Sequence, residues 1–430
     1  MLGLAVTERE SIEEYVIRKE AAPHIKAWLG LLEFGLATKF SRVYGEKGWW
    51  IEKQKLDTKV LEGVRKTYGE DHPNTLTSMA NLAATYQNQE QWLEAEQLEL
   101  QVMKKRKTRF GEDHPDTLTS IANLAVTYQN QGRWSEAEQL ELQVIEKRKT
   151  LLGADHPDTL RSMANLAVAY RNQGGWSEAE QLELQVTEKR KTLIGGNHPG
   201  TLSSMANLAV TYRNQGRWSE AEQLELQVMK KTMTLLGKDH PDTLWSMANL
   251  AATYQNQGQW SEAEQLQLQV TEKRKALLGE DHPDTLRSKA SLAATYQNQG
   301  RWSEAEQLQL QVTEKRRTLL GGDHPDSLWS MANLAATYRN QGRWSEAEQL
   351  QLQVTEKRKT LLGEDHPDTL RSMANLAATY QNQGRWLEAK QLELQVMEKT
   401  KTLLQEDHTD TLGSMANLAI SYGSCKQCRK

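Results

Sequence analysis

Eight histidines, each followed by proline, recur at a constant interval of 42 residues: His72, His114, His156, His198, His240, His282, His324 and His366. Histidine is the commonest metal ligand in proteins, so this ladder suggests a zinc site as one interpretation. Zinc holds its ligands at about 2 Å, whereas equivalent positions in neighbouring packed helical units lie roughly 10 Å or more apart. The spacing therefore favours structural turn residues, and we expect no bound metal.

Two other patterns were considered for chemistry. Cys425 and Cys428 form a CxxC, but one pair without a second pair is a weak metal or redox signal, and a plain tail is the preferred interpretation. The sequence has no GxxxxGK[ST], HExxH or GxSxG pattern to support a nucleotide, metalloprotease or hydrolase site. We therefore expect neither catalysis nor a cofactor.

The 42-residue interval sets the architecture that must position any site. A tryptophan keeps the same interval as the histidine, at Trp92, Trp134, Trp176, Trp218, Trp260, Trp302, Trp344 and Trp386. This gives eight near-identical units over residues 69–407. A fixed period of 20–50 residues indicates a solenoid or repeat array.

Each unit has two helical patterns. In the first unit Leu76, Met79, Leu82 and Ala83 fall on one face of a helix that begins at Pro73, where a missing N–H costs nothing. A glycine usually closes this helix, although the first unit has glutamate there.

A second helix is predicted from Trp92 to about Phe110, with Leu98, Val102 and later Leu-Leu pairs such as Leu151 and Leu152 as its apolar stripe. The tryptophans are expected in the core. Small residues, Ala83 and Ala95, are expected where the two helices cross. Such hairpins must stack on their neighbours to bury both apolar faces, so the fold class is all-α.

The ends differ from the middle of the array. Residues 30–68 form a degenerate unit, and residues 1–29 are expected to hold a capping helix over about 8–21. Residues 408–430 contain one more first helix and then a tail.

The pattern N-L-A-x-x-Y-x-x-x-G-x-W-x-x-A, seen from Asn123 to Ala137, resembles the tetratricopeptide repeat. The 42-residue length and the loop G-x-D-H-P-D-T-L resemble the kinesin light chain branch. The units are similar to the arrays of fungal NB-ARC or NACHT sensor proteins, which are NLR-like. The resemblance implies a right-handed α-solenoid of helical hairpins whose concave face holds extended peptides.

That resemblance also implies a ladder of peptide-gripping asparagines on the first helices: Asn81, Asn123, Asn165, Asn207, Asn249, Asn333 and Asn375. An amide suits a peptide backbone because it offers a donor and an acceptor together. Ser291 interrupts the ladder in the sixth unit.

Beside this ladder, near-identical units differ from one another. The variable positions supply Arg161, Arg171, Arg213, Trp245, Arg287, Trp329, Arg339 and Arg371. Arginine binds carboxylates in bidentate geometry, and both residue types are common binding hot spots. The predicted partner is therefore a protein or extended peptide that is acidic and contains an aromatic residue. Neutral drift on a solvated face is the alternative.

Bulk properties narrow the function further. A net charge of −4 gives no basic face for nucleic acid, and no run of 18 apolar residues could span a membrane. Two cysteines, both near the end of the chain, suit a reducing compartment, so we expect a cytoplasmic protein. The preferred function is the ligand- or partner-sensing array of an NLR-like protein. A kinesin light chain-type cargo adaptor is the alternative. It ranks second because residues 1–29 are too short for the heptad coiled coil that precedes the repeats in that family.

Overall fold

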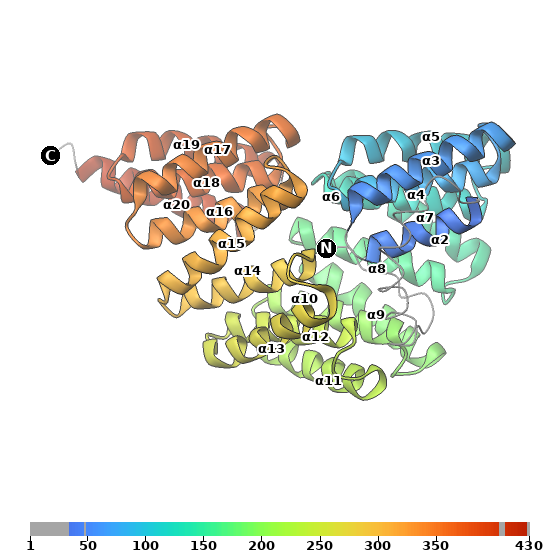
Figure 1. Ribbon diagram of the computed structural model, residues 1–430, viewed down its shortest axis with the longest axis horizontal. Helices are drawn as coiled ribbons and strands as arrows, with labels where there is room; N and C mark the ends of the chain where they lie inside the picture. Colours follow the sequence, from blue (N-terminus) through green and yellow to red (C-terminus); the bar gives the residue numbers. More distant parts are fainter. Residues whose placement is uncertain (1–33, 47–48, 404–408, 428–430) are drawn as a thin grey trace. The chain divides into compact units, whose positions relative to one another are not determined.

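The computed structural model describes residues 34–46, 49–403 and 409–427, and within these ranges the chain consists of helices joined by short turns (Figure 1). Even-numbered helices, here called A helices, are α2 (Phe34–Glu46), α4 (Pro73–Asn88), α6 (Pro115–Asn130), α8 (Pro157–Gln173), α10 (Pro199–Asn214), α12 (Pro241–Asn256), α14 (Pro283–Asn298), α16 (Pro325–Asn340), α18 (Pro367–Asn382) and α20 (Thr409–Gln427). Odd-numbered helices, here called B helices, are α3 (Trp50–Tyr68), α5 (Trp92–Phe110), α7 (Trp134–Leu152), α9 (Trp176–Ile194), α11 (Trp218–Leu236), α13 (Trp260–Leu278), α15 (Trp302–Leu320), α17 (Trp344–Leu362) and α19 (Trp386–Leu403). The predicted helix over 8–21 lies outside the described residues.

The repeated histidine directly precedes each A helix from α4 to α18. In α6, His114 Nδ1 accepts a hydrogen bond from the backbone N–H of Asp116 at 3.1 Å, and all eight units make the equivalent bond. An N-cap acceptor satisfies one of the free N–H groups at a helix start. The prediction of a structural turn histidine is confirmed.

A left-handed residue separates the two helices of each hairpin. Gly132 has φ +74°, and glycine occupies this place in every unit but the first, where Glu90 takes φ +57°. Left-handed backbone costs an L-residue roughly 1–2 kcal/mol. The turn geometry is therefore kept by the fold even where the sequence lacks its preferred residue.

The helices gather into two compact units that each hold several repeats. From here on, the first unit and the second unit mean these two compact parts of the chain, and a single 42-residue block is called a repeat. The first contains α2 to α11 except for residues 171–176, the second contains α13 to α20 with that short segment, and the division falls inside α12 between Ser246 and Met247. Within each unit helices pack against their neighbours in sequence, for example α4 on α5 and α5 on α6. This is the stacking that the unpaired apolar faces predict.

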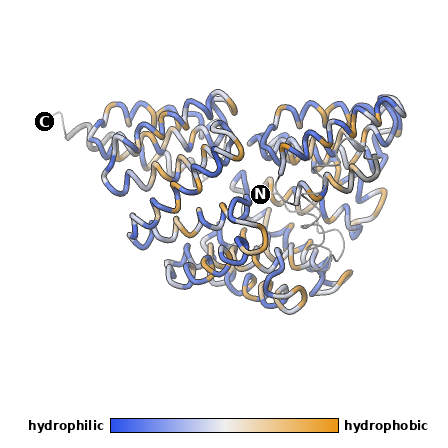
Figure 2. The backbone as a smooth tube through the Cα atoms, in the orientation of Figure 1, coloured by the Kyte–Doolittle hydropathy of each residue, from blue (hydrophilic) through white to orange (hydrophobic). Residues whose placement is uncertain are grey.

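The core follows the predicted stripe. Leu76, Met79, Leu82 and Ala83 of α4 are all buried, as is Ala95 at the facing position of α5. Along each helix hydrophobic and hydrophilic residues mix, with the hydrophobic ones recurring at short intervals (Figure 2). The all-α solenoid of stacked hairpins is confirmed.

Two predictions about the core are wrong. The tryptophans that open the B helices are not core residues, because all are partly exposed and Trp218 and Trp344 are 42% and 43% exposed. Leu151, assigned to the apolar stripe, is 50% exposed. The B helix has 19 residues and the A helix 16, so the ends of the B helix reach past the surface that its partner covers.

Candidate functional site

The asparagines of the predicted groove lie on the A-helix side away from the core. Asn81 and Asn123 are exposed, and the other members are half-buried: Asn165, Asn207, Asn249, Asn333 and Asn375. The leucine that follows each asparagine is buried, as Leu124 is in α6. The track is thus presented on successive A helices within each unit.

One rung of the track is already engaged. Asn165 Nδ2 donates to Glu141 Oε1 at 3.0 Å, and Glu141 is fully buried in α7. The backbone carbonyl of Asn165 accepts from Gln129 Nε2 at 3.0 Å. Asn165 therefore ties its helix to the preceding hairpin as well as bordering the groove.

Three of the predicted arginines project into solvent. Arg161, Arg287 and Arg371 have side chains that are 46%, 61% and 59% exposed. Each pairs with the aspartate three residues earlier on its own helix, as Arg287 does with Asp284 at 3.0 Å. Such exposed pairs hold little free energy, so these guanidinium groups can still be recruited by an anionic ligand.

The other three arginines occupy the position ten residues farther along the A helix, and two of them, Arg213 and Arg339, turn toward neighbouring helices. Arg213 lies 3.3 Å from the buried carboxylate of Glu225, and burial lowers the pKa of the Arg213 guanidinium. Arg339 reaches the backbone carbonyl of Asn375 at 3.5 Å, and burial lowers its pKa too. Arg171 is half-buried. Their predicted role in peptide binding stays a prediction.

The two predicted groove tryptophans differ. Trp245, in the first unit, is 39% exposed. Trp329, in the second unit, is half-buried against a core cluster that includes Leu286 and Val312, and the guanidinium carbon of Arg316 lies 5.3 Å from its ring centroid. Trp329 thus contributes to packing while part of its ring remains accessible.

In the second unit the equivalent positions of three successive A helices carry Arg287, Trp329 and Arg371, on α14, α16 and α18. α16 and α18 are in direct contact. Asn333 and Asn375 follow four residues after Trp329 and Arg371, one helical turn farther along. Cationic, aromatic and amide groups are therefore combined on one face.

Sequence reasoning missed the polar joints between hairpins. Arg148, 1% exposed at the end of α7, donates to the backbone carbonyl of Asp158 at 3.0 Å and to Ser162 Oγ at 2.8 Å. The available signal was that an arginine and a serine each recur at fixed places in most repeats.

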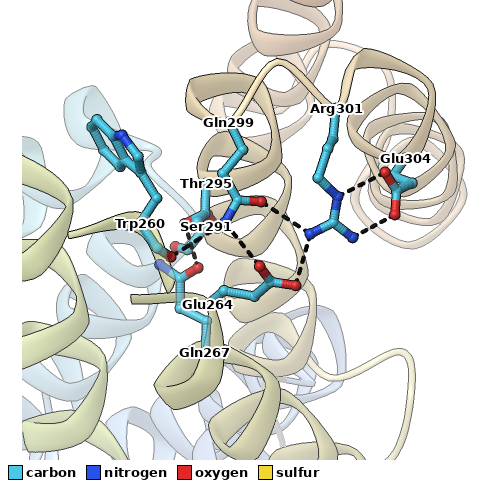
Figure 3. A network of polar contacts seen from close by, with 8 residues as sticks. All are labelled: Trp260, Glu264, Gln267, Ser291, Thr295, Gln299, Arg301 and Glu304. Carbon is cyan, nitrogen blue, oxygen red and sulfur yellow. Dashed lines mark hydrogen bonds and ion pairs between the residues drawn. The ribbon is translucent and has the colours of Figure 1, made fainter. Parts of the chain in front are cut away.

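A second joint is formed at the turn between the A and B helices of a hairpin, for example between α14 and α15 (Figure 3). Arg301 donates to Glu264 at 2.8 Å and is also paired with Glu304, while Gln299 Nε2 donates to Glu264 at 2.8 Å. The guanidinium carbon of Arg301 lies 4.0 Å from the ring centroid of Tyr296. The carboxylates raise the pKa of Arg301, so it stays charged. This arginine positions one hairpin against the next.

The B helices offer a different surface. A hollow of about 320 Å³ lies among α7, α8 and α9, and an equivalent one of about 300 Å³ lies among α17, α18 and α19. Leu142 and Leu352 line them and are 44% and 39% exposed. These hollows have a mixed polar and apolar lining and recur five repeats apart.

The repeat pattern has a recognised counterpart. Residues 75–116, 117–158, 159–200, 201–242 and 243–284 each match a tetratricopeptide repeat model, and residues 284–360 and 335–402 match a second model of that name. The chain belongs to the tetratricopeptide repeat family. Repeats of this family typically mediate protein interactions, and no catalytic family is indicated.

Several solved structures are similar to this one. A kinesin light chain-like protein of Podospora anserina with nearly identical repeats is 35% identical over 48% of this chain and 97% of its own, with a TM-score of 0.41. A Rap protein complexed with competence and sporulation factor is 10% identical over 91% of this chain and 98% of its own, with a TM-score of 0.56, and shows the shared fold.

A third similar structure is a signal-transduction ATPase with numerous domains from Pyrococcus horikoshii, which has a tetratricopeptide repeat sensor. It is 13% identical over 83% of this chain and 54% of its own, with a TM-score of 0.47. The comparison with curated proteins gave no match.

Among the described residues of this tetratricopeptide repeat protein, no three histidine, cysteine, aspartate or glutamate side chains are grouped as a metal site would need. No described helix has the length and apolar character required to cross a membrane.

Proposed function

We propose that this tetratricopeptide repeat chain is a non-catalytic scaffold that binds a protein or an extended peptide along the groove face of its A helices, the face that carries the asparagine track. The observation that carries the proposal is the row of Arg287, Trp329 and Arg371 on successive A helices, with Asn333 and Asn375 beside it. An acidic peptide with an aromatic residue complements this surface, because arginine binds carboxylates and tryptophan supplies contact area.

We further propose that the array senses a ligand or partner within an NLR-like protein of the cytoplasm. The long run of near-identical repeats supports this context. The loop G-x-D-H-P-D-T-L, as in residues 153–160 where alanine follows the glycine, supports a kinesin light chain-type cargo adaptor as the second candidate. Nucleic acid and membrane surfaces are not expected partners, because the chain has a net charge of −4 and lacks a long apolar run.

The proposal can be tested with synthetic peptides and fluorescence anisotropy. The probe is a labelled ten-residue peptide of aspartate and glutamate with one central tryptophan, and the control is the same peptide with lysine in place of the acids. We expect only the acidic probe to bind, and more weakly as salt rises. Equal binding of both peptides, or of neither, would contradict the proposed partner chemistry.

Three variants locate the site. Trp329→Ala should weaken binding roughly 30-fold at any salt, the effect of losing a hot spot of about 2 kcal/mol. Arg371→Gln should weaken it chiefly at low salt, through slower association. Trp344→Ala removes a more exposed tryptophan from the B helix of the same repeat and should leave binding unchanged.

Because Trp329 also packs against the core, Trp329→Phe and circular dichroism separate lost contact from lost folding. If Trp329→Ala and Arg371→Gln bind normally while Trp344→Ala does not, the B-helix surface is the binding site and the groove proposal is wrong.

A further inference from the structure

The joints between hairpins contain buried carboxyl groups that the proposed binding function does not use. They occupy one repeated position on the inner side of the B helix. In the first unit this position holds Asp57, Glu99, Glu141, Glu183 and Glu225, and in the second unit it holds Gln267, Gln309 and Gln351, followed by Glu393. All nine side chains are buried. The same structural position thus carries an acid in six repeats and glutamine in three.

At the joint between the first two of the eight repeats, two neutral donors form hydrogen bonds to Glu99. Thr127 Oγ1 of α6 donates to Glu99 Oε2 at 2.5 Å, and Gln87 Nε2 of α4 donates to Glu99 Oε1 at 2.8 Å. Among the described residues, the charged group that acts on Glu99 is another acid, Glu96 of the same helix. Burial raises the pKa of Glu99 to about 7, against a partial lowering by the Thr127 bond.

Glu141 occupies the next joint, where its polar neighbours on α8 are Asn165 and Ser162. Most repeats place a threonine on the following A helix at the position of Thr127, but here that position holds Ala169. Glu141 Oε1 instead accepts from Asn165 of α8, and within the described residues Glu141 Oε2 has no hydrogen-bond partner.

The charged groups that act on Glu141 are Arg148 of its own helix and Arg161 of α8, while α6 contributes the neutral Gln129 to this joint. Both arginines favour the ionised form. Burial nevertheless dominates and raises the pKa of Glu141 to about 7.

Three joints of the second unit, at Gln267, Gln309 and Gln351, are built without an acid at this position. Thr295 Oγ1 donates to Gln267 Oε1 at 2.6 Å, and Gln255 Nε2 donates to Thr295 Oγ1 at 2.6 Å. These two bonds match those that Thr127 makes with Glu99 and Gln87, with an amide in place of the carboxyl. A glutamine side chain has nearly the shape of a protonated glutamate, so the substitution matches the neutral form.

We propose that the joints at Glu99 and Glu141 are pH-sensitive fastenings: the protonated carboxyls hold adjacent hairpins together, and loss of the protons loosens the first unit while the glutamine joints of the second unit are unaffected. The physical cause is the cost of burying a carboxylate that forms no direct ion pair among the described residues. In the opened joint the carboxyl is solvated and its pKa returns to the ordinary value of 4.5.

The direction follows from these two pKa values. A carboxyl with a higher pKa in the closed joint than in the open one stabilises the closed joint at low pH. Opening becomes easier as pH rises from 4.5 to about 7 and changes little above that. Between pH 5.5 and 8.5 the two values imply that the opening equilibrium of one joint rises about 30-fold.

Hydrogen exchange followed by mass spectrometry on the full chain tests this, with rates corrected for the intrinsic pH dependence of exchange. Protection of α6 and α8 should fall about 30-fold from pH 5.5 to 8.5 relative to α14 and α16. The double variant Glu99→Gln and Glu141→Gln should remove this fall. Gln267→Glu should create a similar fall in α14.

The proposal is overturned if the wild-type chain shows no fall in the first unit, or if the double variant shows the same fall. It is also overturned if Gln267→Glu leaves α14 insensitive to pH while the variant remains folded by circular dichroism at pH 5.5. The Gln267→Glu arm does not depend on the two first-unit variants folding, so a result is obtained in either case.

Discussion

Lys289 offers a sharp test of how the hairpin core is built. All seven remaining repeats have a buried methionine or isoleucine at this position, and Lys289 is itself only 8% exposed. Its Nζ reaches Glu280 Oε1 at 2.8 Å, in the loop before α14. The aliphatic stem is therefore buried while the ammonium group extends to the half-exposed carboxylate.

Lys289→Met should stabilise this hairpin. A fully buried methionine contributes about 1.5–3 kcal/mol relative to an exposed one, and the lysine stem already supplies part of that, so we expect a gain of about 1 kcal/mol. The ion pair that is lost involves an exposed carboxylate and should matter less than this gain.

The assay is hydrogen exchange over residues 284–300. In the wild-type chain this segment should exchange faster than the equivalent segments of α16 and α18. Lys289→Met should slow it about fivefold, the factor that corresponds to 1 kcal/mol. Uniform protection across the three helices, or no slowing in the variant, would refute the reasoning.

Two reverse substitutions form a matched control. Met331 and Met373 are 2% exposed at the equivalent positions of α16 and α18. Gly322 stands where Glu280 would serve Met331→Lys, whereas Glu364 stands ready for Met373→Lys. Met331→Lys should therefore be the more damaging of the two, as measured by thermal unfolding.

Three further predictions concern packing and turns in the first unit. Ala125→Leu, at a fully buried crossing, should cost ~1–3 kcal/mol and lower the melting temperature, whereas Asn123→Leu on the exposed face should barely change it; equal shifts would contradict the helix phase. Glu90→Gly should stabilise the first hairpin by about 1 kcal/mol because it removes left-handed strain, and a lower midpoint in a urea titration would count against this. Ala169→Thr should give the Glu141 carboxyl the hydroxyl partner found in other repeats, raising stability at pH 8 by about 1 kcal/mol; a loss of stability would mean that the site has no room for it.

The helices were predictable because their signals are local. Pro73, the histidine before it and the tryptophan of the next helix mark starts, and the observed helices Pro73–Asn88 and Trp92–Phe110 begin where those residues predict. The apolar stripe and the alanines at the crossing also follow from spacing along one helix. Each of these features can be read within about 20 residues.

The polar joints were not predictable in the same way. Arg148 and Ser162 are 14 residues apart on different helices, and Glu99 and Thr127 are 28 apart. A polar residue in phase with an apolar stripe looks like an imperfection until its partner is placed opposite. The same limit applies to Arg213 and Arg339, which share a helix side with the groove but reach across to neighbouring helices.

Each kind of polar pair keeps its own sequence separation from one repeat to the next. Lys105 to Asp71 and Lys147 to Asp113 both span 34 residues, and Arg148 to Ser162 spans the same 14 as Arg316 to Ser330. A duplication or deletion of one whole 42-residue block would therefore join each donor to an acceptor of the same kind. A cut of any other length would leave a buried arginine facing the wrong side chain. Gene rearrangement can lengthen or shorten such an array in whole blocks while every seam stays chemically complete.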